Sequence, residues 1–228
     1  MWNRQQVKEQ AKIIMKRNYW KMFVVTLLAG LLTGEKTTII ERVQNFASTN
    51  ISYDTSPIFY SSNFQYIFYT FISIASILGI LYTIFIGNVI VVGKSRYFIK
   101  NHDVNPELGE IFSGFKGNYL NVVKIMFLMN LKILLWLFLF IVPGFIKAYE
   151  YSMIPYLLAE NPNLSASQAF SLSKQMTTGQ KMDLFVLDLS FLGWIILGLI
   201  CCGIGILFVL PYPEATRAEV YLILKQQV

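Results

Sequence analysis

The sequence predicts an all-α, polytopic membrane protein with about six membrane arms, built as three helical hairpins that alternate with amphipathic interfacial helices. Two observations lead to this fold class. Hydrophobic residues make up 55% of the 228 residues, charged residues make up 14%, and the mean hydropathy is +0.51. A soluble domain of this length carries far more charge. In addition, 39 consecutive residues between Asp54 and Lys94 carry no formal charge, about twice the roughly 20 residues that cross a bilayer core.

The distribution of basic residues predicts the orientation of the chain. The net charge is +6, and thirteen basic residues before or between the apolar blocks fall on one side of the predicted membrane, against only Lys36 and Arg42 on the other. This asymmetry is the positive-inside bias. It places both termini in the cytoplasm, and it explains the basic composition better than a nucleic-acid surface does. We therefore expect no nucleic-acid partner and a single integral membrane domain over residues 1–228.

The six predicted arms follow the apolar blocks of the sequence. The third and fourth are joined by Val142-Pro143-Gly144, the fifth and sixth by Cys202-Gly203-Ile204-Gly205, and a longer outer segment, 34–63, joins the first two. The fourth arm has only 15 residues, which span about 22 Å, so it either crosses a thinned bilayer or is re-entrant. A rival topology treats Leu189–Leu210 as one span and places the C-terminus outside. The arms cover residues 19–33, 64–92, 120–142, 145–159, 184–200 and 204–223.

A short amphipathic helix is expected before each hairpin, over residues 1–18, 104–117 and 164–178. Apolar residues in these segments recur at helical spacing, and charged or polar residues occupy the other face. In the third segment, Ser165 and Gln168 have the spacing of a capping box, which predicts the start of the helix. Helices of this kind lie in the membrane interface or pack against one another beneath the bundle.

Part of the sequence repeats. Residues 126–136 (MFLMNLKILLW) align without gaps to residues 184–194 (LFVLDLSFLGW), which matches Trp136 with Trp194 and places Asn130 opposite Asp188. Each copy then reaches a glycine-containing tip. The alignment supports a hairpin that is used at least twice.

The tract VPGFIKAYEYSMIPYLLAENPNLSASQAFSLSKQM (142–176), followed by DLFVLDLSFLGW and GIGILFVLPYPEATRAEVY, resembles a bacterial integral-membrane family known as domain of unknown function 975. The N-terminal AKIIMKRNYW fits the same pattern, so the resemblance extends over nearly the whole chain. More loosely, the alternation of hairpins and amphipathic helices is similar to the membrane domain attached to some bacterial glycerophosphodiester phosphodiesterases. The resemblance implies a multi-pass protein of the bacterial cytoplasmic (inner) membrane, and it implies no particular activity.

Most constellations that carry chemistry are absent from the sequence. His102 is the only histidine, which excludes a histidine-dependent triad and a histidine-rich metal site. The sequence also lacks a phosphate-binding glycine loop, and Gly79 and Gly87 are expected to permit close helix packing. We expect no catalytic residues, no cofactor and no metal.

Seven polar or charged residues within the predicted arms form the candidate site. Isolated charges at the bilayer centre cost about 2.5–3.5 kcal/mol on insertion scales, so we expect the three bases and three acids to compensate one another inside the bundle. Tyr149, Tyr151, Tyr212 and Thr216 are expected hydrogen-bonding members. The predicted buried polar network consists of Asn130, Lys132, Lys147, Glu150, Asp188, Glu214 and Arg217.

This network has two interpretations at the level of sequence. In the first, the charge pairs set the register of the helices and are structural. In the second, they line a polar cavity that binds a headgroup, an ion or a small amphiphile. The preferred function is a non-enzymatic accessory or regulatory component that binds membrane lipids or a partner membrane protein. The alternatives are a small transporter that uses the charged interior and an intramembrane lipid-modifying enzyme.

Overall fold

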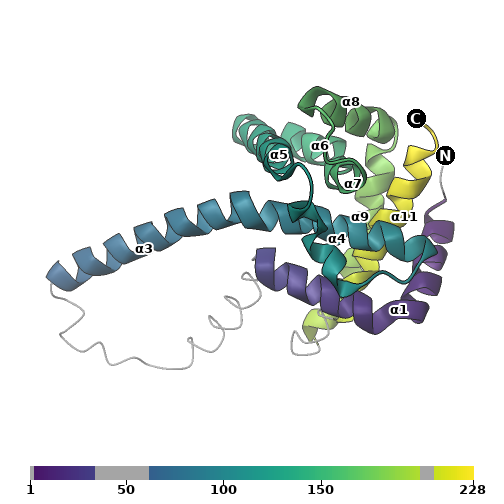
Figure 1. Cartoon of the computed structure of the whole chain (residues 1–228), viewed down its shortest axis with the longest axis horizontal. Helices are drawn as coiled ribbons and strands as arrows, with labels where there is room; N and C mark the ends of the chain where they lie inside the picture. The colour runs from purple at the N-terminus through teal and green to yellow at the C-terminus, as the bar shows by residue number, and fades with distance from the viewer. Residues whose placement is uncertain (1–2, 34–61, 201–207) are drawn as a thin grey trace.

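The computed structural model describes residues 3–33, 62–200 and 208–228. Most of the predicted outer segment 34–63, and the predicted tip that contains Cys202, lie outside these residues. In the described ranges every regular element is a helix, which confirms the all-α class (Figure 1). The elements are α1 (Arg4–Thr33), α3 (Ser62–Tyr82), the π-helix η2 (Thr83–Gly87), α4 (Asn88–Asp103), the 3₁₀ helix η3 (Leu108–Phe115), α5 (Tyr119–Leu139), α6 (Ile141–Glu150), α7 (Ile154–Glu160), α8 (Ala166–Thr177), α9 (Lys181–Ile200) and α11 (Pro211–Lys225).

Helix α1 bends at the boundary expected between the first amphipathic segment and the first arm. Asn18 has non-helical backbone angles (φ −135°, ψ 28°) inside the helix. Its side-chain amide donates a hydrogen bond to the side-chain oxygen of Asn101 at 2.8 Å, and the guanidinium of Arg17 donates to the Asn101 carbonyl oxygen at 2.6 Å. These contacts attach the bend of α1 to the end of α4.

The other two amphipathic segments also contain helices. In the third, Ser165 caps α8, and both reciprocal bonds of the capping box with Gln168 are present, which confirms that prediction. In the second, the helix is the 3₁₀ turn η3, with Ile111 buried against α4.

The long helix formed by α3, η2 and α4 has two different halves. Figure 1 shows α3 extending away from the rest of the molecule, whereas α4 lies among the other helices. Every residue from Tyr66 to Thr83 is exposed, while most of α4 is buried. The π-helix η2 lies at the border between the two halves.

The number of membrane arms predicted from the sequence needs correction. Two helical stretches in the described residues, Tyr66–Asp103 and Tyr119–Leu139, are long and apolar enough to cross a membrane, whereas about six arms were expected. The fourth arm is broken into α6 and α7, of 10 and 7 residues. Helix α1 bends at Asn18, just before the first arm begins, and α11 in the sixth arm has 15 residues. Apolar composition alone does not reveal these interruptions.

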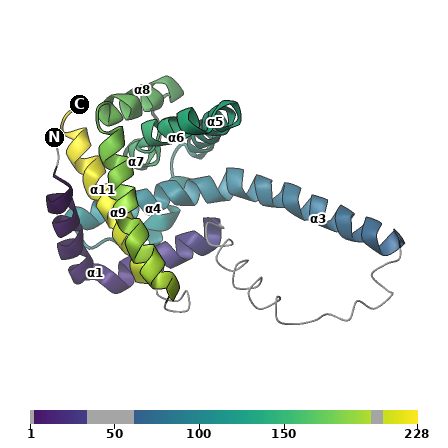
Figure 2. The same ribbon diagram turned by 180° about the vertical axis from the view of Figure 1, so that it is seen from behind.

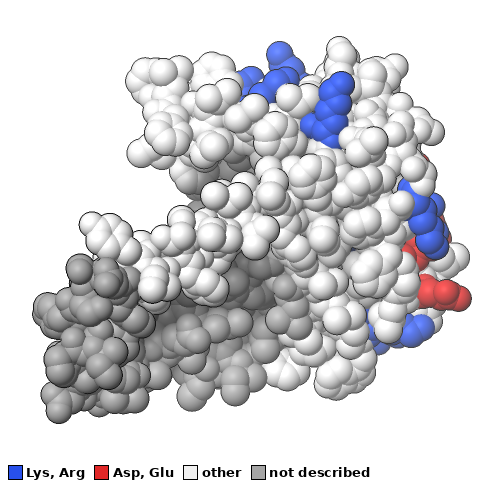
Figure 3. Space-filling view, turned by 60° about the vertical axis from the view of Figure 1, so that its left-hand side comes forward, with Lys and Arg blue, Asp and Glu red and all other residues white. Residues whose placement is uncertain are grey.

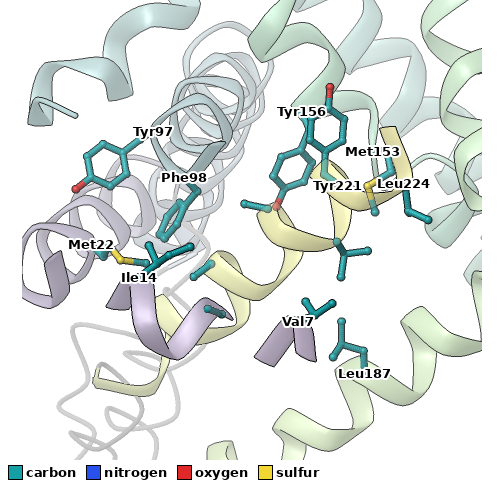
Figure 4. Packing of buried hydrophobic residues seen from close by; sticks show 14 of the residues in the cluster. Val7, Ile14, Met22, Tyr97, Phe98, Met153, Tyr156, Leu187, Tyr221 and Leu224 are labelled. Atoms are coloured by element: carbon teal, nitrogen blue, oxygen red, sulfur yellow. The ribbon is translucent and has the colours of Figure 1, made fainter. Parts of the chain in front are cut away.

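The hydrophobic core lies around α4, away from α3. One cluster joins α1, α4, α7, α9 and α11, and it includes Met22, Tyr97, Leu187 and Tyr221 (Figure 4). Helices α9 and α11 lie behind α4 in Figure 1 and in front of it in Figure 2. A second cluster packs the first half of α5 against α4, α7 and α8. The first turns of α1 and the last turns of α11 share the first cluster, so the two ends of the chain lie on the same side.

Glycines permit close packing at positions other than those expected. A Cβ atom at Gly93 would clash with the backbone of Ile111, and one at Gly114 would clash with that of Val89, so α4 and η3 touch through their backbones. A Cβ at Gly79 would meet no described atom within 4 Å, and one at Gly87 would make only ordinary contacts. Gly87 therefore lies near the backbone of Thr33 in α1, whereas Gly79 has no close neighbour among the described residues.

Candidate functional site: a set of buried charge clusters

The break between α6 and α7 positions the first cluster. Pro155 lies in the first turn of α7 and has no backbone N–H to donate. The N–H of Ile154 donates to the carbonyl oxygen of Tyr151 at 3.1 Å, in place of the Glu150 carbonyl that a continuous α-helix would offer it. Two hydroxyls of α8 donate hydrogen bonds to the Glu150 carbonyl oxygen instead, Ser173 at 2.7 Å and Thr177 at 3.3 Å. The broken arm is thereby fastened to the third amphipathic helix.

The side chain of Glu150 binds two lysines. Its Oε1 lies 2.8 Å from Nζ of Lys147, and its Oε2 lies 2.7 Å from Nζ of Lys181. Glu150 is only 3% exposed. A buried carboxylate of this kind needs compensation because desolvation penalises its charged form. Lys181, at the start of α9, is a partner that the sequence did not indicate.

Asp188 and Arg217 form the second cluster. Nη2 of Arg217 lies 2.7 Å from Oδ2 of Asp188, and the hydroxyl of Tyr149 donates to the same oxygen at 3.1 Å. The pair connects α9 to α11, and Tyr149 adds α6. Three segments of the predicted fourth, fifth and sixth arms therefore meet at one carboxylate.

These clusters lie in the part of the chain that matches a known family. Residues 138–228 match the model of the family described as protein of unknown function (DUF975). The match covers the C-terminal part of the chain, from the end of α5 through α11. No match was found among curated proteins or among solved structures. The looser similarity to the membrane domain of glycerophosphodiester phosphodiesterases stays a prediction.

Glu214 lies in the segment that matches the family model and is paired with a residue outside that segment. Oε1 of Glu214 is 2.8 Å from Nζ of Lys94 in α4, and the Lys94 side chain is 6% exposed. In the sequence, Lys94 is one of the basic residues assigned to the cytoplasmic side. Lys94 directly follows a long uncharged run, and no acidic residue nearby in the sequence indicates that it is buried and paired.

Asn130 contributes to a separate polar pair. Its side-chain amide donates to the side-chain oxygen of Asn88 at 3.0 Å, which joins α5 to the start of α4. The two amides lie in the wall of an open groove of about 580 Å³ between α3, η2 and α5. The rest of that wall is mostly apolar, with Ile80, Phe127 and Leu134 among its residues.

Lys132 does not join the network of carboxylates. It is exposed, and its Nζ lies 3.7 Å from the centroid of the Phe170 ring in α8. Among the described residues, no carboxylate lies within 4 Å of it. The helix turns Lys132 toward α8, whereas Asn130, two residues earlier, faces α4.

The remaining expected members have other contacts. Tyr151 packs edge-on against Phe170, Tyr212 packs edge-on against Phe191, and Thr216 donates to the carbonyl oxygen of Tyr212 in its own helix. Of these expected hydrogen-bonding residues, Tyr149 is the one that hydrogen-bonds to a charged side chain of the set within the described residues. The predicted single network is thus a series of separate, locally compensated clusters.

The acids of the clusters are paired with bases. Each of the three predicted acids already accepts hydrogen bonds from a lysine or arginine. His102 contacts Glu219 through Nδ1, at 2.9 and 3.0 Å from the two carboxylate oxygens. Over the described residues, no group of three or more histidine, cysteine, aspartate or glutamate side chains is placed to hold a metal ion. The arrangement ties α4, α6, α8, α9 and α11 together.

Proposed function

We propose that this chain is a non-enzymatic accessory or regulatory component of the bacterial cytoplasmic membrane, with both termini in the cytoplasm, that binds lipid or a partner membrane protein. The observation that carries the proposal is the uncovered apolar surface of α3. Its 21 residues include no charged side chain, and tyrosine, phenylalanine and isoleucine are exposed along its length. An apolar surface of this extent marks a contact with a membrane or with another protein.

The dimensions of α3 suit a bilayer. At 1.5 Å per residue, 21 residues span about 31 Å, which is close to the roughly 30 Å of a hydrocarbon core. Figure 3 shows the face from which α3 projects, where charged side chains occupy the top and the right-hand edge only. The compensated charge clusters lie in the packed helices, where neighbouring side chains satisfy them. This separation supports a structural role for the clusters and a binding role for α3.

A pair of lysine substitutions tests the membrane contact of α3. Ile74 in α3 is 53% exposed, and Val104 in the loop after α4 is 56% exposed. Because a lysine at the centre of a spanning helix costs about 2.5–3.5 kcal/mol on insertion scales, Ile74→Lys should lower the fraction of protein that resists extraction of membranes by alkaline carbonate. Val104→Lys should leave that fraction unchanged. Equal behaviour of the two variants would remove the basis of the proposal.

The role as a binding component is tested by the molecules that purify with the chain. Extraction in a mild detergent, followed by mass spectrometry of lipids and proteins, should recover a stoichiometric lipid or one reproducible membrane protein. A lipid-free, partner-free monomer that conducts solute in proteoliposomes would favour the transporter alternative. Altered lipid composition of membranes after deletion of the gene would favour the enzyme.

A further inference from the structure

We propose that the lysines at the junction of α5, α6 and α8 bind a phosphate group, such as the headgroup of an anionic phospholipid. This inference rests on the proposed function and names the chemistry of its ligand. The site, here called the lysine junction, consists of Lys132, Lys147, Trp136, Tyr151 and Phe170.

Positive charge is in excess at the lysine junction. Glu150 is shared by Lys147 and Lys181, so one carboxylate compensates two ammonium groups. Lys132 adds a third, and its described contact is with the face of an aromatic ring. In the part of the chain that the structure describes, Glu150 is the only carboxylate within 4 Å of these three lysines, so the junction has a local surplus of positive charge.

Aromatic rings connect the two lysines. Nζ of Lys132 lies over Phe170, the Phe170 ring packs edge-on against Tyr151 with centroids 4.9 Å apart, and Nζ of Lys147 lies 5.7 Å from the centroid of Tyr151. Lys147 is also 5.7 Å from the Trp136 ring. Aromatic faces attract ammonium groups without neutralising them, so Lys132 keeps the capacity to bind an anion, while Lys147 shares the carboxylate of Glu150 with Lys181.

The junction lies where the α5–α6 hairpin leaves the protein body. In the first half of α5, Val122, Ile125 and Met129 are buried, whereas from Leu131 to the hairpin tip most side chains are exposed and apolar. The stretch from Leu131 to Leu139 spans about 13 Å at 1.5 Å per residue, or roughly half of a 30 Å hydrocarbon core. A hairpin tip inserted to that depth places Lys132 at the level of lipid headgroups.

The combination matches one kind of ligand. A phosphate group supplies the negative charge that the lysines lack, and lysine binds phosphate as a compact point charge. The exposed hairpin offers apolar surface beside it for acyl chains. Trp136, at 38% exposure, is of the residue type that sits at membrane–water interfaces.

The test measures binding of dioleoyl phosphatidylglycerol and dioleoyl phosphatidylcholine to the full chain in detergent, by titration with native mass spectrometry. A lysine near a membrane surface contributes about 1 kcal/mol, equivalent to a change of about fivefold in Kd. We expect tighter binding of phosphatidylglycerol, weakened about fivefold by Lys132→Gln and by Lys147→Gln. Lys132→Arg should retain it because the charge is kept.

Lys124 provides the matched control. It is an exposed lysine of α5, two turns before Lys132, so Lys124→Gln removes the same charge from the same helix away from the junction. If Lys124→Gln weakens binding as much as Lys132→Gln, or if the two lipids bind equally well, the inference is wrong. Circular dichroism and gel filtration of each variant establish that the fold is intact.

A competition experiment distinguishes a lipid headgroup from a free phosphate compound. Glycerol 3-phosphate at millimolar concentration should fail to displace phosphatidylglycerol if the lipid is the ligand, because the acyl chains contribute to binding. Full displacement would identify the site as one for a free phosphate compound. Weaker binding by Lys132→Gln would in that case still support a phosphate site at the lysine junction. Lipid that co-purifies without any headgroup preference overturns the inference and leaves the proposed function standing.

Discussion

The hydroxyl of Ser173 donates a hydrogen bond of 2.7 Å to the carbonyl oxygen of Glu150, and this bond joins α8 to the break between α6 and α7. Both residues are buried. Ser173→Ala removes the shorter of the two hydroxyl bonds to this carbonyl and leaves Thr177 as a donor at 3.3 Å, so we expect a loss of about 0.5–1.5 kcal/mol, the usual net contribution of one hydrogen bond. Ser171→Ala, at an exposed position of the same helix, is the control. Equilibrium unfolding in detergent micelles measures both, and equal stability of the two variants would show that the bond is dispensable.

Substitution of one lysine beside Glu150 should reduce the stability of the fold less than substitution of Glu150 itself. Lys147→Met leaves Glu150 paired with Lys181, so we expect a loss of about 1 kcal/mol or less. Glu150→Gln removes the shared carboxylate and leaves two ammonium groups facing one another, and a loss of about 3–5 kcal/mol is typical for a broken buried pair. Thermal unfolding of the two variants compares them directly. A larger loss for Lys147→Met would mean that Lys181 does not compensate Glu150.

Gly93 should be among the positions least tolerant of a methyl group. Gly93→Ala places a Cβ against the Ile111 carbonyl, and because both atoms belong to packed backbones, the helix and the 3₁₀ turn must separate. Overpacking of this kind costs about 1–3 kcal/mol or more. Gly79→Ala should be neutral or slightly stabilising, since alanine is favoured in helices by about 1 kcal/mol. The yield of folded protein after gel filtration, with thermal unfolding of the recovered protein, separates the two outcomes.

Lys8 gives the fold a dependence on alkaline pH. Burial lowers the pKa of Lys8 below its ordinary value, and the nearby Lys12 and Arg4 lower it further. Its Nζ lies 2.6 Å from Oγ of Ser190. A lysine with a lowered pKa binds fewer protons in the folded state than in the unfolded state. Stability contributed through Lys8 should therefore rise as the pH increases from the lowered pKa toward the ordinary value of 10.5.

The comparison that isolates this effect is between the unmodified chain and Lys8→Gln. The difference in their free energy of unfolding should change with pH in that alkaline window and stay constant at neutral pH. A difference that is constant throughout the alkaline range would show that the environment of Lys8 does not perturb its titration.

The sequence was informative where a local pattern determines the structure. The capping box at Ser165 and the helical class of the chain follow from short-range signals, and they are present in the structure. The bend at Asn18 lies where the polar segment was expected to give way to the apolar one. In each case the determining residues are neighbours in the chain.

Long-range pairing was harder to predict. Lys94 and Glu214 are 120 residues apart in sequence, and no periodicity in either segment indicates that they meet. Lys132 and Asn130 were assigned to one network because both are polar residues within a predicted membrane arm, yet they face different helices. The break of the fourth arm was visible as Pro155, but its consequence depends on hydroxyls that α8 supplies to the Glu150 carbonyl.

The π-helix η2 has a consequence for insertions and deletions in this chain. A π-turn holds one residue more than a turn of α-helix, whereas each residue of an α-helix rotates the chain by about 100° around the axis. The wider turn absorbs its extra residue, so loss of one residue between Thr83 and Gly87 would restore an ordinary helix and leave the faces of α3 and α4 aligned. Loss of one residue within α3 itself would instead rotate the part of α3 before it by about 100° relative to α4.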